Sequence, residues 1–315
     1  MIAVVGGAGI LIRVRMIPQE DTYEKPMMGD TFDYETLNVA AKVAQGDDVE
    51  VDNSGSAFNI ACHLAEMGKE VAFASVTADD AMGLAVTEQL KKYGIETKYM
   101  KKVEGSTPVE MQILNVLNDP QMVFGNSKLY EAMTSEMAEG WSELFDQAEA
   151  IVVDGNLPKE TLEYIANKYG DKKLFFDPAG HAGAVNSREI AGKFYCIMPG
   201  RVEAEAMARR TVLSADQLME AGSYFEEQGV SRTIITIKGG GLYYKEGLSE
   251  GILAPERVLS FAMTTGAGDV VSAAVIAADL DGKNIEETGK FAMEKAAQFL
   301  ADKNDERLID TLNQQ

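Results

Sequence analysis

Residues 264–269 have the composition of an anion-binding turn at the start of a helix. They read Thr-Thr-Gly-Ala-Gly-Asp, and the apolar residues 270–275 follow at once. Glycines at such a point let successive backbone N–H groups converge, and the helix dipole adds partial positive charge. Asp269 lies where a carboxylate could take a proton from a hydroxyl group. The segment therefore favours phosphoryl-transfer chemistry, or in its simplest structural interpretation a helix with Asp269 as N-cap.

Two further glycine turns carry polar side chains at positions suited to ligand binding. Residues 54–61 read Ser-Gly-Ser-Ala-Phe-Asn-Ile-Ala, so Asn59 lies near the start of an expected helix, where its amide could bind a hydroxylated ligand or cap the helix. Residues 236–241 read Thr-Ile-Lys-Gly-Gly-Gly at the end of an expected strand. That arrangement lets backbone approach phosphates while Lys238 supplies one positive charge.

Short apolar runs alternate with amphipathic stretches along most of the chain. Strands are expected at 2–5, 71–76, 150–153, 174–176, 195–198 and 233–237, and helices at 59–67, 82–93, 157–169, 215–228, 270–280 and 285–302. This alternation predicts an α/β fold with a mostly parallel sheet covered on both faces. No fixed-period repeat or linker divides the chain, so we expect one domain over residues 1–315.

Two segments interrupt the alternation. Residues 11–36 contain charges and two prolines without a clean helical pattern, and residues 107–124 read as two strands, 109–116 and 122–124, around a turn at 118–120. An isolated hairpin needs something to pack against, so an inserted hairpin is typical of a lid or a dimer clasp. The alternative is a surface hairpin with no function.

The composition excludes several classes of protein. The chain has 29 Lys and Arg against 50 Asp and Glu, a formal net charge of −21, which disfavours nucleic-acid and anionic-membrane partners. An anionic substrate would need local compensation from a helix N-terminus, a lysine or a metal ion.

Cys62 and Cys196 lie far apart, as do His63 and His181, so no zinc cluster is expected. Without a secretory or membrane-spanning pattern, we expect a cytoplasmic protein.

Together these segments resemble the PfkB family of carbohydrate and nucleoside kinases, with the ribokinase-like fold, over nearly the whole chain. Residues 264–269 resemble the C-terminal signature of the family, and residues 54–61, Gly68 and residues 79–83 resemble its N-terminal signature more loosely. The resemblance implies a three-layer α/β sandwich with a central, mostly parallel sheet and a small β lid. It also implies ATP as phosphoryl donor, Mg²⁺, and a sugar or nucleoside acceptor, and it leaves a monovalent cation open as a further cofactor.

The resemblance also assigns roles to individual residues. Asp269 would be the catalytic base, and the backbone of Gly266, Ala267 and Gly268 would form the anion hole. Glu203 matches the glutamate of the NxxE element, which organises Mg²⁺ and phosphates, and our hypothesis places Asp177 near the same metal. The nucleotide-binding candidates are Thr236, Lys238, Gly241, Thr265 and Glu203, and the acceptor-side candidates are Gly55 and Asn59.

The chain departs from the family pattern at four positions, one of which is Ala78, where a glycine is common. Leu11 stands where the family usually has an acidic residue that holds acceptor hydroxyls, Gly200 replaces the asparagine of NxxE, and Met263 replaces an acid. These departures keep open a second class of function, a catalytically impaired ligand-binding protein on a kinase fold. Asp269, the side chain that phosphoryl transfer most needs, is present.

Two short segments bear on the nature of the acceptor. Residues 152–158 and 199–204 look somewhat like the pseudouridine-kinase branch, so a nucleoside kinase is an alternative to a sugar kinase.

A dinucleotide-dependent oxidoreductase is disfavoured because Ile12 occupies the third glycine position after Gly7 and Gly9. No P-loop motif occurs. The expected partners are ATP, the small-molecule acceptor and a second copy of the chain joined through the β lids.

Overall fold

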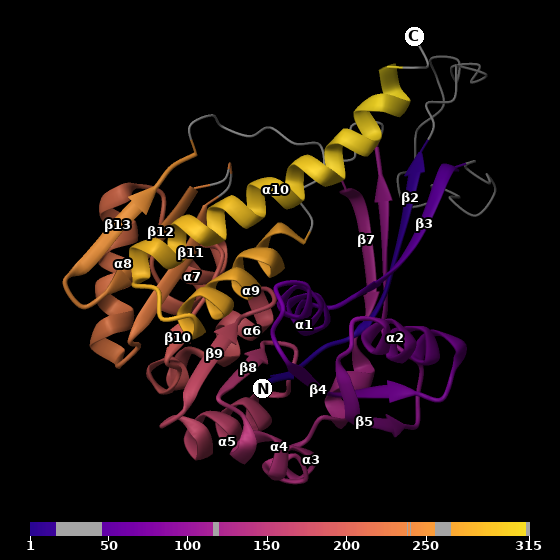
Figure 1. Cartoon of the computed structure of the whole chain (residues 1–315), viewed down its shortest axis with the longest axis horizontal. Helices are drawn as coiled ribbons and strands as arrows, with labels where there is room; N and C mark the ends of the chain where they lie inside the picture. The colour runs from indigo at the N-terminus through magenta and orange to yellow at the C-terminus, as the bar shows by residue number, and fades with distance from the viewer. Residues whose placement is uncertain (17–45, 116–119, 238, 240, 256–265, 313–315) are drawn as a thin grey trace, which may run out of the picture.

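Two β-sheets of unequal size form the framework of the protein (Figure 1). A computed structural model describes residues 1–16, 46–115, 120–237, 239, 241–255 and 266–312. The larger sheet has nine strands, in spatial order β13 (Ser249–Leu253), β12 (Gly241–Glu246), β11 (Arg232–Ile237), β10 (Cys196–Ile197), β9 (Lys173–Asp177), β8 (Ala150–Asp154), β1 (Ile2–Val5), β4 (Val71–Ala78) and β5 (Glu96–Val103). The smaller sheet has the order β3 (Gly46–Ser54), β2 (Gly9–Met16), β6 (Val109–Leu114) and β7 (Pro120–Asn126).

The larger sheet is parallel from β11 to β5, and β12 and β13 continue it as an antiparallel edge. Its central strands are covered on both faces, which explains their continuous apolar sequences. In β1, Ala3 and Val5 belong to one hydrophobic core, whereas Ile2 and Val4 belong to the other. One strand therefore contributes to two cores, because successive side chains point to opposite faces of a sheet.

Helices pack against both faces of the larger sheet and complete a three-layer α/β sandwich (Figure 1). On one face lie α1 (Ser56–Glu66), α2 (Ala81–Lys92), α9 (Ala267–Leu280) and α10 (Ile285–Leu312). On the other lie α3 (Ser135–Glu139), α4 (Ser142–Gln147), α5 (Lys159–Tyr169), α6 (His181–Asn186), α7 (Arg201–Ala208), α8 (Ala215–Gln228) and the 3₁₀ helices η3 (Lys128–Ala132) and η4 (Arg188–Lys193).

The smaller sheet combines two distant parts of the chain. Strand β2 pairs antiparallel with β3 and parallel with β6, and β6 pairs antiparallel with β7. The two expected lid segments thus supply strands of one sheet, together with β3, which sequence patterns did not indicate. Residues 17–36 and 116–119 of those segments lie outside the described residues. Pro120 begins β7, where the sequence predicted a turn residue.

Several other elements differ from the sequence-based expectations. Strands β5 and β13 were not predicted, because they contain charged or small residues and lie at the two edges of the larger sheet. Strand β12 is buried but starts at a glycine, which concealed it among turn residues. Helix α10 continues to Leu312, past its predicted end at residue 302.

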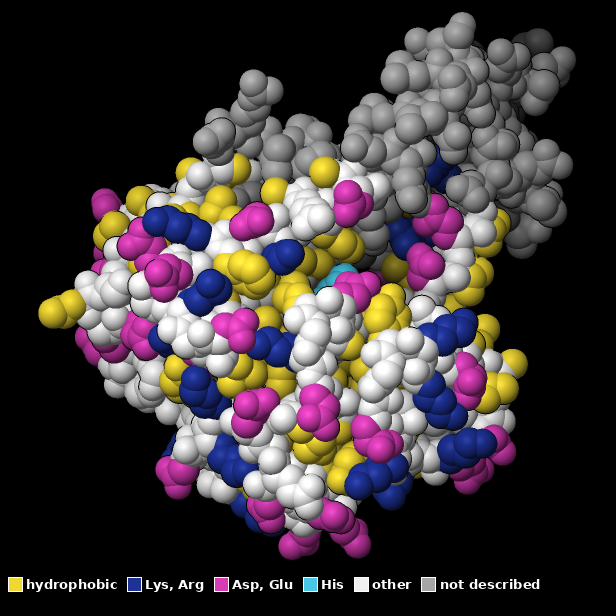
Figure 2. Space-filling model, in the orientation of Figure 1, with side chains coloured by type: hydrophobic (Ala, Val, Ile, Leu, Met, Phe, Trp, Pro, Cys, Tyr) yellow, Lys and Arg dark blue, Asp and Glu magenta, His cyan; other side chains and the backbone are white. Residues whose placement is uncertain are grey.

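Charges of both signs share the face of the molecule seen in Figure 2. There, Asp and Glu side chains alternate with Lys and Arg, and no continuous basic surface is visible among the described residues. On this face, the acidic side chains behind the net charge of −21 are thus interspersed with basic ones.

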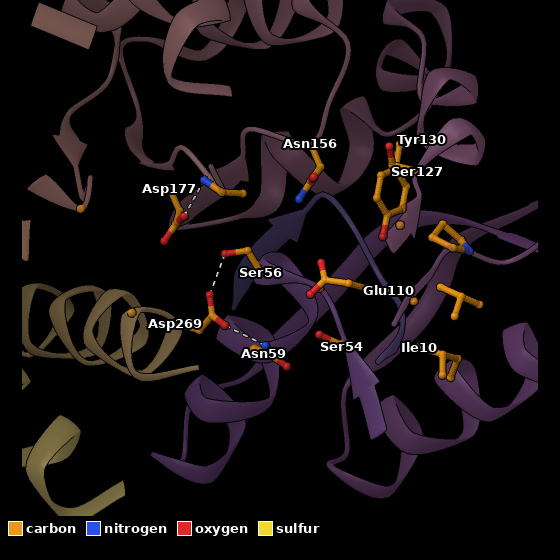
Figure 3. A pocket seen from close by; sticks show the side chains of 18 of the residues that line it. Ile10, Ser54, Ser56, Asn59, Glu110, Ser127, Tyr130, Asn156, Asp177 and Asp269 are labelled. Atoms are coloured by element: carbon orange, nitrogen blue, oxygen red, sulfur yellow. Dashed lines mark hydrogen bonds between the residues drawn. The ribbon is translucent and has the colours of Figure 1, made fainter. Parts of the chain in front are cut away.

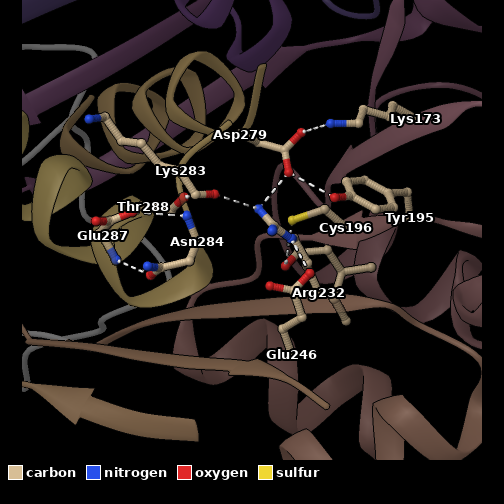
Figure 4. Close-up of polar contacts among 11 residues, drawn as sticks. Lys173, Tyr195, Cys196, Arg232, Glu246, Asp279, Lys283, Asn284, Glu287 and Thr288 are labelled. Carbon is tan, nitrogen blue, oxygen red and sulfur yellow. Dashed lines mark hydrogen bonds and ion pairs between the residues drawn. The ribbon is translucent and has the colours of Figure 1, made fainter. Parts of the chain in front are cut away.

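A buried ionic network ties the C-terminal end of α9 to the sheet (Figure 4). The Asp279 carboxylate, 1% exposed, accepts from Arg232 Nη1 at 2.5 Å, Lys173 Nζ at 2.6 Å and Tyr195 Oη at 2.8 Å. Arg232 also donates through Nε to Glu246 at 2.7 Å. Buried charged side chains need partners of opposite charge and hydrogen bonds such as these, because an unpaired buried charge strongly destabilises the fold.

Replacing Asp279 by alanine should therefore lower the free energy of unfolding by about 3 kcal/mol, since Arg232 would remain buried without its main partner. Denaturant titration measures the change. Asp281→Ala is the matched control, because Asp281 forms an exposed ion pair with Lys69 and should cost less than about 1 kcal/mol. Equal losses in the two variants would contradict the assignment.

Candidate active site

A cavity of about 580 Å³ opens where the carboxyl ends of the central parallel strands meet the smaller sheet (Figure 3). Strand β1 lies between β8 and β4, so the chain continues to both sides of β1, and crevices at such switch points are common ligand sites in open α/β sheets. Strands β2, β6 and β7 contribute lining residues on one side, and the N-terminal ends of α1, α7 and α9 contribute them on the other.

Asp269 lies in the first turn of α9, and two side chains of α1 hold it (Figure 3). Its Oδ1 accepts from Ser56 Oγ at 2.8 Å, and its Oδ2 accepts from Asn59 Nδ2 at 2.7 Å. Both oxygens are thus oriented, and the carboxylate lines the cavity. Asn59, which the sequence placed on the acceptor side, lines the cavity and also positions Asp269.

Burial raises the pKa of Asp269 to about 7, and the negative charge of Asp177 acts in the same direction. Hydrogen bonds from Asn59 and Ser56 lower this pKa, and the charge of Asp154 raises it. A general base works best when its pKa lies near the operating pH, so Asp269 suits proton abstraction from a hydroxyl at neutral pH.

Helix α1 is placed by a tight backbone contact and a buried carboxylate. Gly55 has a φ of 121°, and a Cβ there would lie 2.4 Å from the carbonyl oxygen of Gly7, so glycine is required. Asp154 is fully buried and accepts from the backbone N–H of Gly7 at 2.9 Å and of Ala57 at 3.0 Å. It also accepts from Asn156 N at 3.0 Å and Nδ2 at 3.1 Å.

Asp154 therefore joins the ends of β1 and β8 to the start of α1. Burial raises its pKa to about 6 despite these four donors. The sequence analysis missed this residue, although an acid that ends an apolar strand is an unusual feature and could have drawn attention.

Two carboxylates lie on the α7 side of the cavity. Glu203 accepts from the backbone N–H of Gly180 and of Gly200, each at 2.6 Å, and so caps α7. Asp177 accepts from Ser272 Oγ at 2.6 Å and from Ala179 N at 2.9 Å. Burial raises the pKa of both carboxyl groups, and the charge of Asp177 raises that of Glu203 further.

Most of the sequence-predicted site residues meet at this cavity. Its lining includes Gly55, Asn59, Asp177, Glu203, Thr236, Gly268 and Asp269. Gly266, with a φ of 90°, is the N-cap of α9, and Ala267 is the first residue of that helix, so both adjoin the lining.

The remaining predicted positions fall elsewhere. Gly241 begins β12 and is not part of the lining, and Lys238, Thr265 and Met263 lie outside the described residues. Leu11 is buried in β2, where it lines no part of the cavity.

Sequence reasoning missed the lining residues that come from β6, β7 and the segments after β7 and β8. These residues are mostly polar, and they are Glu110, Asn126, Ser127, Tyr130 and Asn156. They carry no local motif. The residues of β6 and β7 reach the cavity through the pairing of β6 with β2 across nearly one hundred residues of sequence, and Asn156 is held there by Asp154 at the end of β8.

The signature of the pfkB family carbohydrate kinases matches residues 26–311. The chain belongs to this family. It is 24% identical to the pseudouridine kinase of Escherichia coli over 83% of each protein, and 25% identical to the guanosine-inosine kinase of Exiguobacterium acetylicum over 81% of this chain and 85% of that one. The ribokinase of Thermotoga maritima superimposes with a TM-score of 0.76 at 22% identity, covering 94% of this chain and 91% of the other.

Membership of the PfkB family makes the protein a phosphotransferase with an alcohol group as acceptor, on a ribokinase-like fold. Kinases of this kind use ATP with Mg²⁺. In the described part of the chain, every helix is too short or too polar to span a lipid bilayer.

The described residues contain no cluster of three or more His, Cys, Asp or Glu that could enclose a metal ion. The carboxylates of Asp177 and Glu203 nevertheless fit Mg²⁺, because Mg²⁺ keeps several waters and is usually held by one or two carboxylates together with substrate phosphates. Burial raises the pKa of both carboxyl groups, and the charge of Asp177 raises that of Glu203 further, so a divalent cation bound here would offset negative charge.

Asp269→Asn should lower turnover by at least about 100-fold, because asparagine keeps the shape of the side chain but cannot accept the proton. A coupled ADP-release assay measures this, with circular dichroism to confirm the fold. Asp146→Asn, at an exposed position outside the cavity, is the matched control and should retain full activity. Near-normal turnover in the Asp269 variant would show that the base is another group.

The acid limb of kcat/KM against pH should lie near pH 7, because Asp269 must be ionised to act and its pKa is about 7. Ser56→Ala removes a hydrogen bond that favours the ionised form, so the limb should move to higher pH by about half a unit or more. A limb that stays in place or moves to lower pH would contradict this assignment.

Proposed function

We propose that the protein transfers the γ-phosphoryl group of ATP to a hydroxyl of a sugar or nucleoside, with Asp269 as the catalytic base. The observation that carries the proposal is the position of Asp269. It is held by Ser56 and Asn59 in the first turn of α9, inside a cavity that the smaller sheet lines on one side and the α7 terminus on the other.

The geometry supports a direct, in-line transfer. Asp269 orients the acceptor hydroxyl and takes its proton as the oxygen attacks the phosphorus. The backbone of Gly266, Ala267 and Gly268 lies at the positive end of the α9 dipole, where N–H groups stabilise charge on the transferred group. Thr236 and Gly200 line the adjoining side of the cavity, which we assign to the nucleotide.

Asp177 and Glu203 are the residues we propose to hold Mg²⁺, through bound water. When bound, the ion neutralises phosphate charge. This arrangement would let a chain of net charge −21 bind ATP, because the positive charge beside the phosphates would come from within the site. The helix N-terminus and the metal would supply the compensation, with Lys238 as a further candidate. A monovalent cation remains a separate hypothesis.

The smaller sheet is proposed to act as a lid on a single domain. Strands β2, β6 and β7 line the acceptor side of the cavity, and closing it would exclude water and limit ATP hydrolysis. We also propose a homodimer through this sheet. Its support is a set of exposed apolar side chains, Val49, Val51, Met111, Met122 and Phe124, which share one face according to the strand register.

Similarity to two nucleoside kinases bears on which acceptor the protein phosphorylates. The relatives named for pseudouridine and for guanosine and inosine match over four fifths of this chain, which supports a nucleoside as the second candidate beside a sugar. Their identities of 24% and 25% leave the choice to experiment.

ADP release should be stimulated by at least one acceptor from a panel of ribose, fructose, pseudouridine, guanosine and inosine, and chelation of Mg²⁺ should abolish it. Nucleotide binding, measured by calorimetry, should weaken strongly when EDTA replaces Mg²⁺, because the surroundings of the phosphates are acidic. ATP binding without acceptor-stimulated ADP release would instead favour a ligand-binding protein. Tight binding that needs no metal would contradict the charge argument.

A further inference from the structure

Glu110 projects into the cavity from the smaller sheet, on the side opposite the α7 carboxylates (Figure 3). Its Oε1 accepts from Gln112 Nε2 at 2.7 Å, and Gln112 is itself buried at 8% exposure. Within the described residues, Oε2 has no hydrogen-bond donor from the protein. The carboxylate is thus oriented by one partner, and it points into the part of the cavity that Ser54 and Ser56 also line (Figure 3).

The neighbours of Glu110 leave room for a ligand beside it. In the strand register, Glu110 pairs with buried Leu11 on β2 and with Gly125 on β7. A Cβ added at Gly125 would have no atom within 4 Å, so the space over this glycine is open. Leu11, which is buried and lines no part of the cavity, offers no polar partner on one side, and Gly125 leaves the space on the other side open.

The charges around the cavity are of one sign. Its described lining contains four carboxylates, those of Glu110, Asp177, Glu203 and Asp269, and no lysine, arginine or histidine. Arg13 lies on the same face of the smaller sheet as Glu110 by strand register, but Asp52 and Glu50 pair with it. An acceptor that carried its own carboxylate or phosphate would therefore be repelled from the acceptor side.

We propose that Glu110 determines acceptor specificity by binding two neighbouring hydrogen-bond donors of an uncharged acceptor, such as a vicinal diol, and by excluding anionic sugars. This inference rests on the proposed kinase function and adds the acceptor class. A carboxylate accepts two parallel donors well, and the Gln112 contact keeps it in the orientation to do so.

Glu110→Gln should weaken binding of the preferred neutral acceptor about 10- to 100-fold, the value of a hydrogen bond to a charged group. The acceptor KM should rise by the same factor while kcat changes little, because Glu110 does not touch the transferred phosphoryl group. Calorimetry with ribose, pseudouridine and guanosine as neutral probes, and 2-dehydro-3-deoxygluconate and ribose 5-phosphate as anionic ones, measures the affinities. Glu104→Gln, at an exposed position outside the lining, is the matched control and should bind all five probes like the wild type.

Gly125→Ala gives a second test that does not depend on Glu110. Its methyl group fits the free protein without a clash, so thermal unfolding should be unchanged while acceptor binding weakens. An anionic probe that binds more tightly than every neutral one overturns the inference, as does equal binding by wild type and Glu110→Gln. If neutral acceptors stimulate ADP release equally in the wild type and in Glu110→Gln, only the role proposed for Glu110 is contradicted. If no acceptor stimulates ADP release, the proposed kinase function is contradicted, and the calorimetric affinities still decide the role of Glu110.

Discussion

Asp269 is held by Ser56 and Asn59, and this contact joins helices whose residues are 213 and 210 positions apart in the chain. The contact depends on where α1 begins. That point is set by the close approach of Gly55 to the carbonyl of Gly7 and by Asp154, which binds the backbone of Gly7 and Ala57. The edge of the sheet, the start of α1 and the Asp269 carboxylate thus form one continuous set of contacts. The chain leaves this set after Gly7 to form β2 and returns to it from β3 at Gly55.

The departures from the family pattern have different structural meanings. Gly200 gives Glu203 its backbone N–H at 2.6 Å, so that carboxylate is anchored without the usual asparagine side chain. Leu11 changes the site more than Gly200 does, because β2 then lacks the carboxylate that the family usually has at this position. The neighbouring strand carries one at the paired position, Glu110, and that residue lines the cavity. The cavity therefore has a carboxylate from the strand adjacent to β2.

The sequence predicted the parts of the protein whose signals are local. The central strands are apolar on both faces, and the turn before α9 has glycines beside an acid, so the sheet and Asp269 were recognisable from short windows. The smaller sheet was only partly recognisable. Strand β3 and Glu110 acquire their roles through pairing between distant segments, which no local pattern encodes. Asp154 was missed for a related reason, because its importance lies in four hydrogen-bond donors from three residues that are distant in sequence or carry no motif.

The raised pKa values of Asp154 and Asp269 link the site to the stability of the whole fold. Each group titrates at a higher pH when folded than its ordinary 3.8, so the unfolded chain loses these protons first and stability falls as pH rises from about 4 to about 7. At neutral pH the folded protein keeps these carboxylates charged at a free-energy cost, which comes mainly from their burial and, at Asp269, also from the charges of Asp177 and Asp154. A ligand that brings positive charge to the site lowers this cost, so part of its binding free energy comes from relief of a penalty that the unliganded protein already carries.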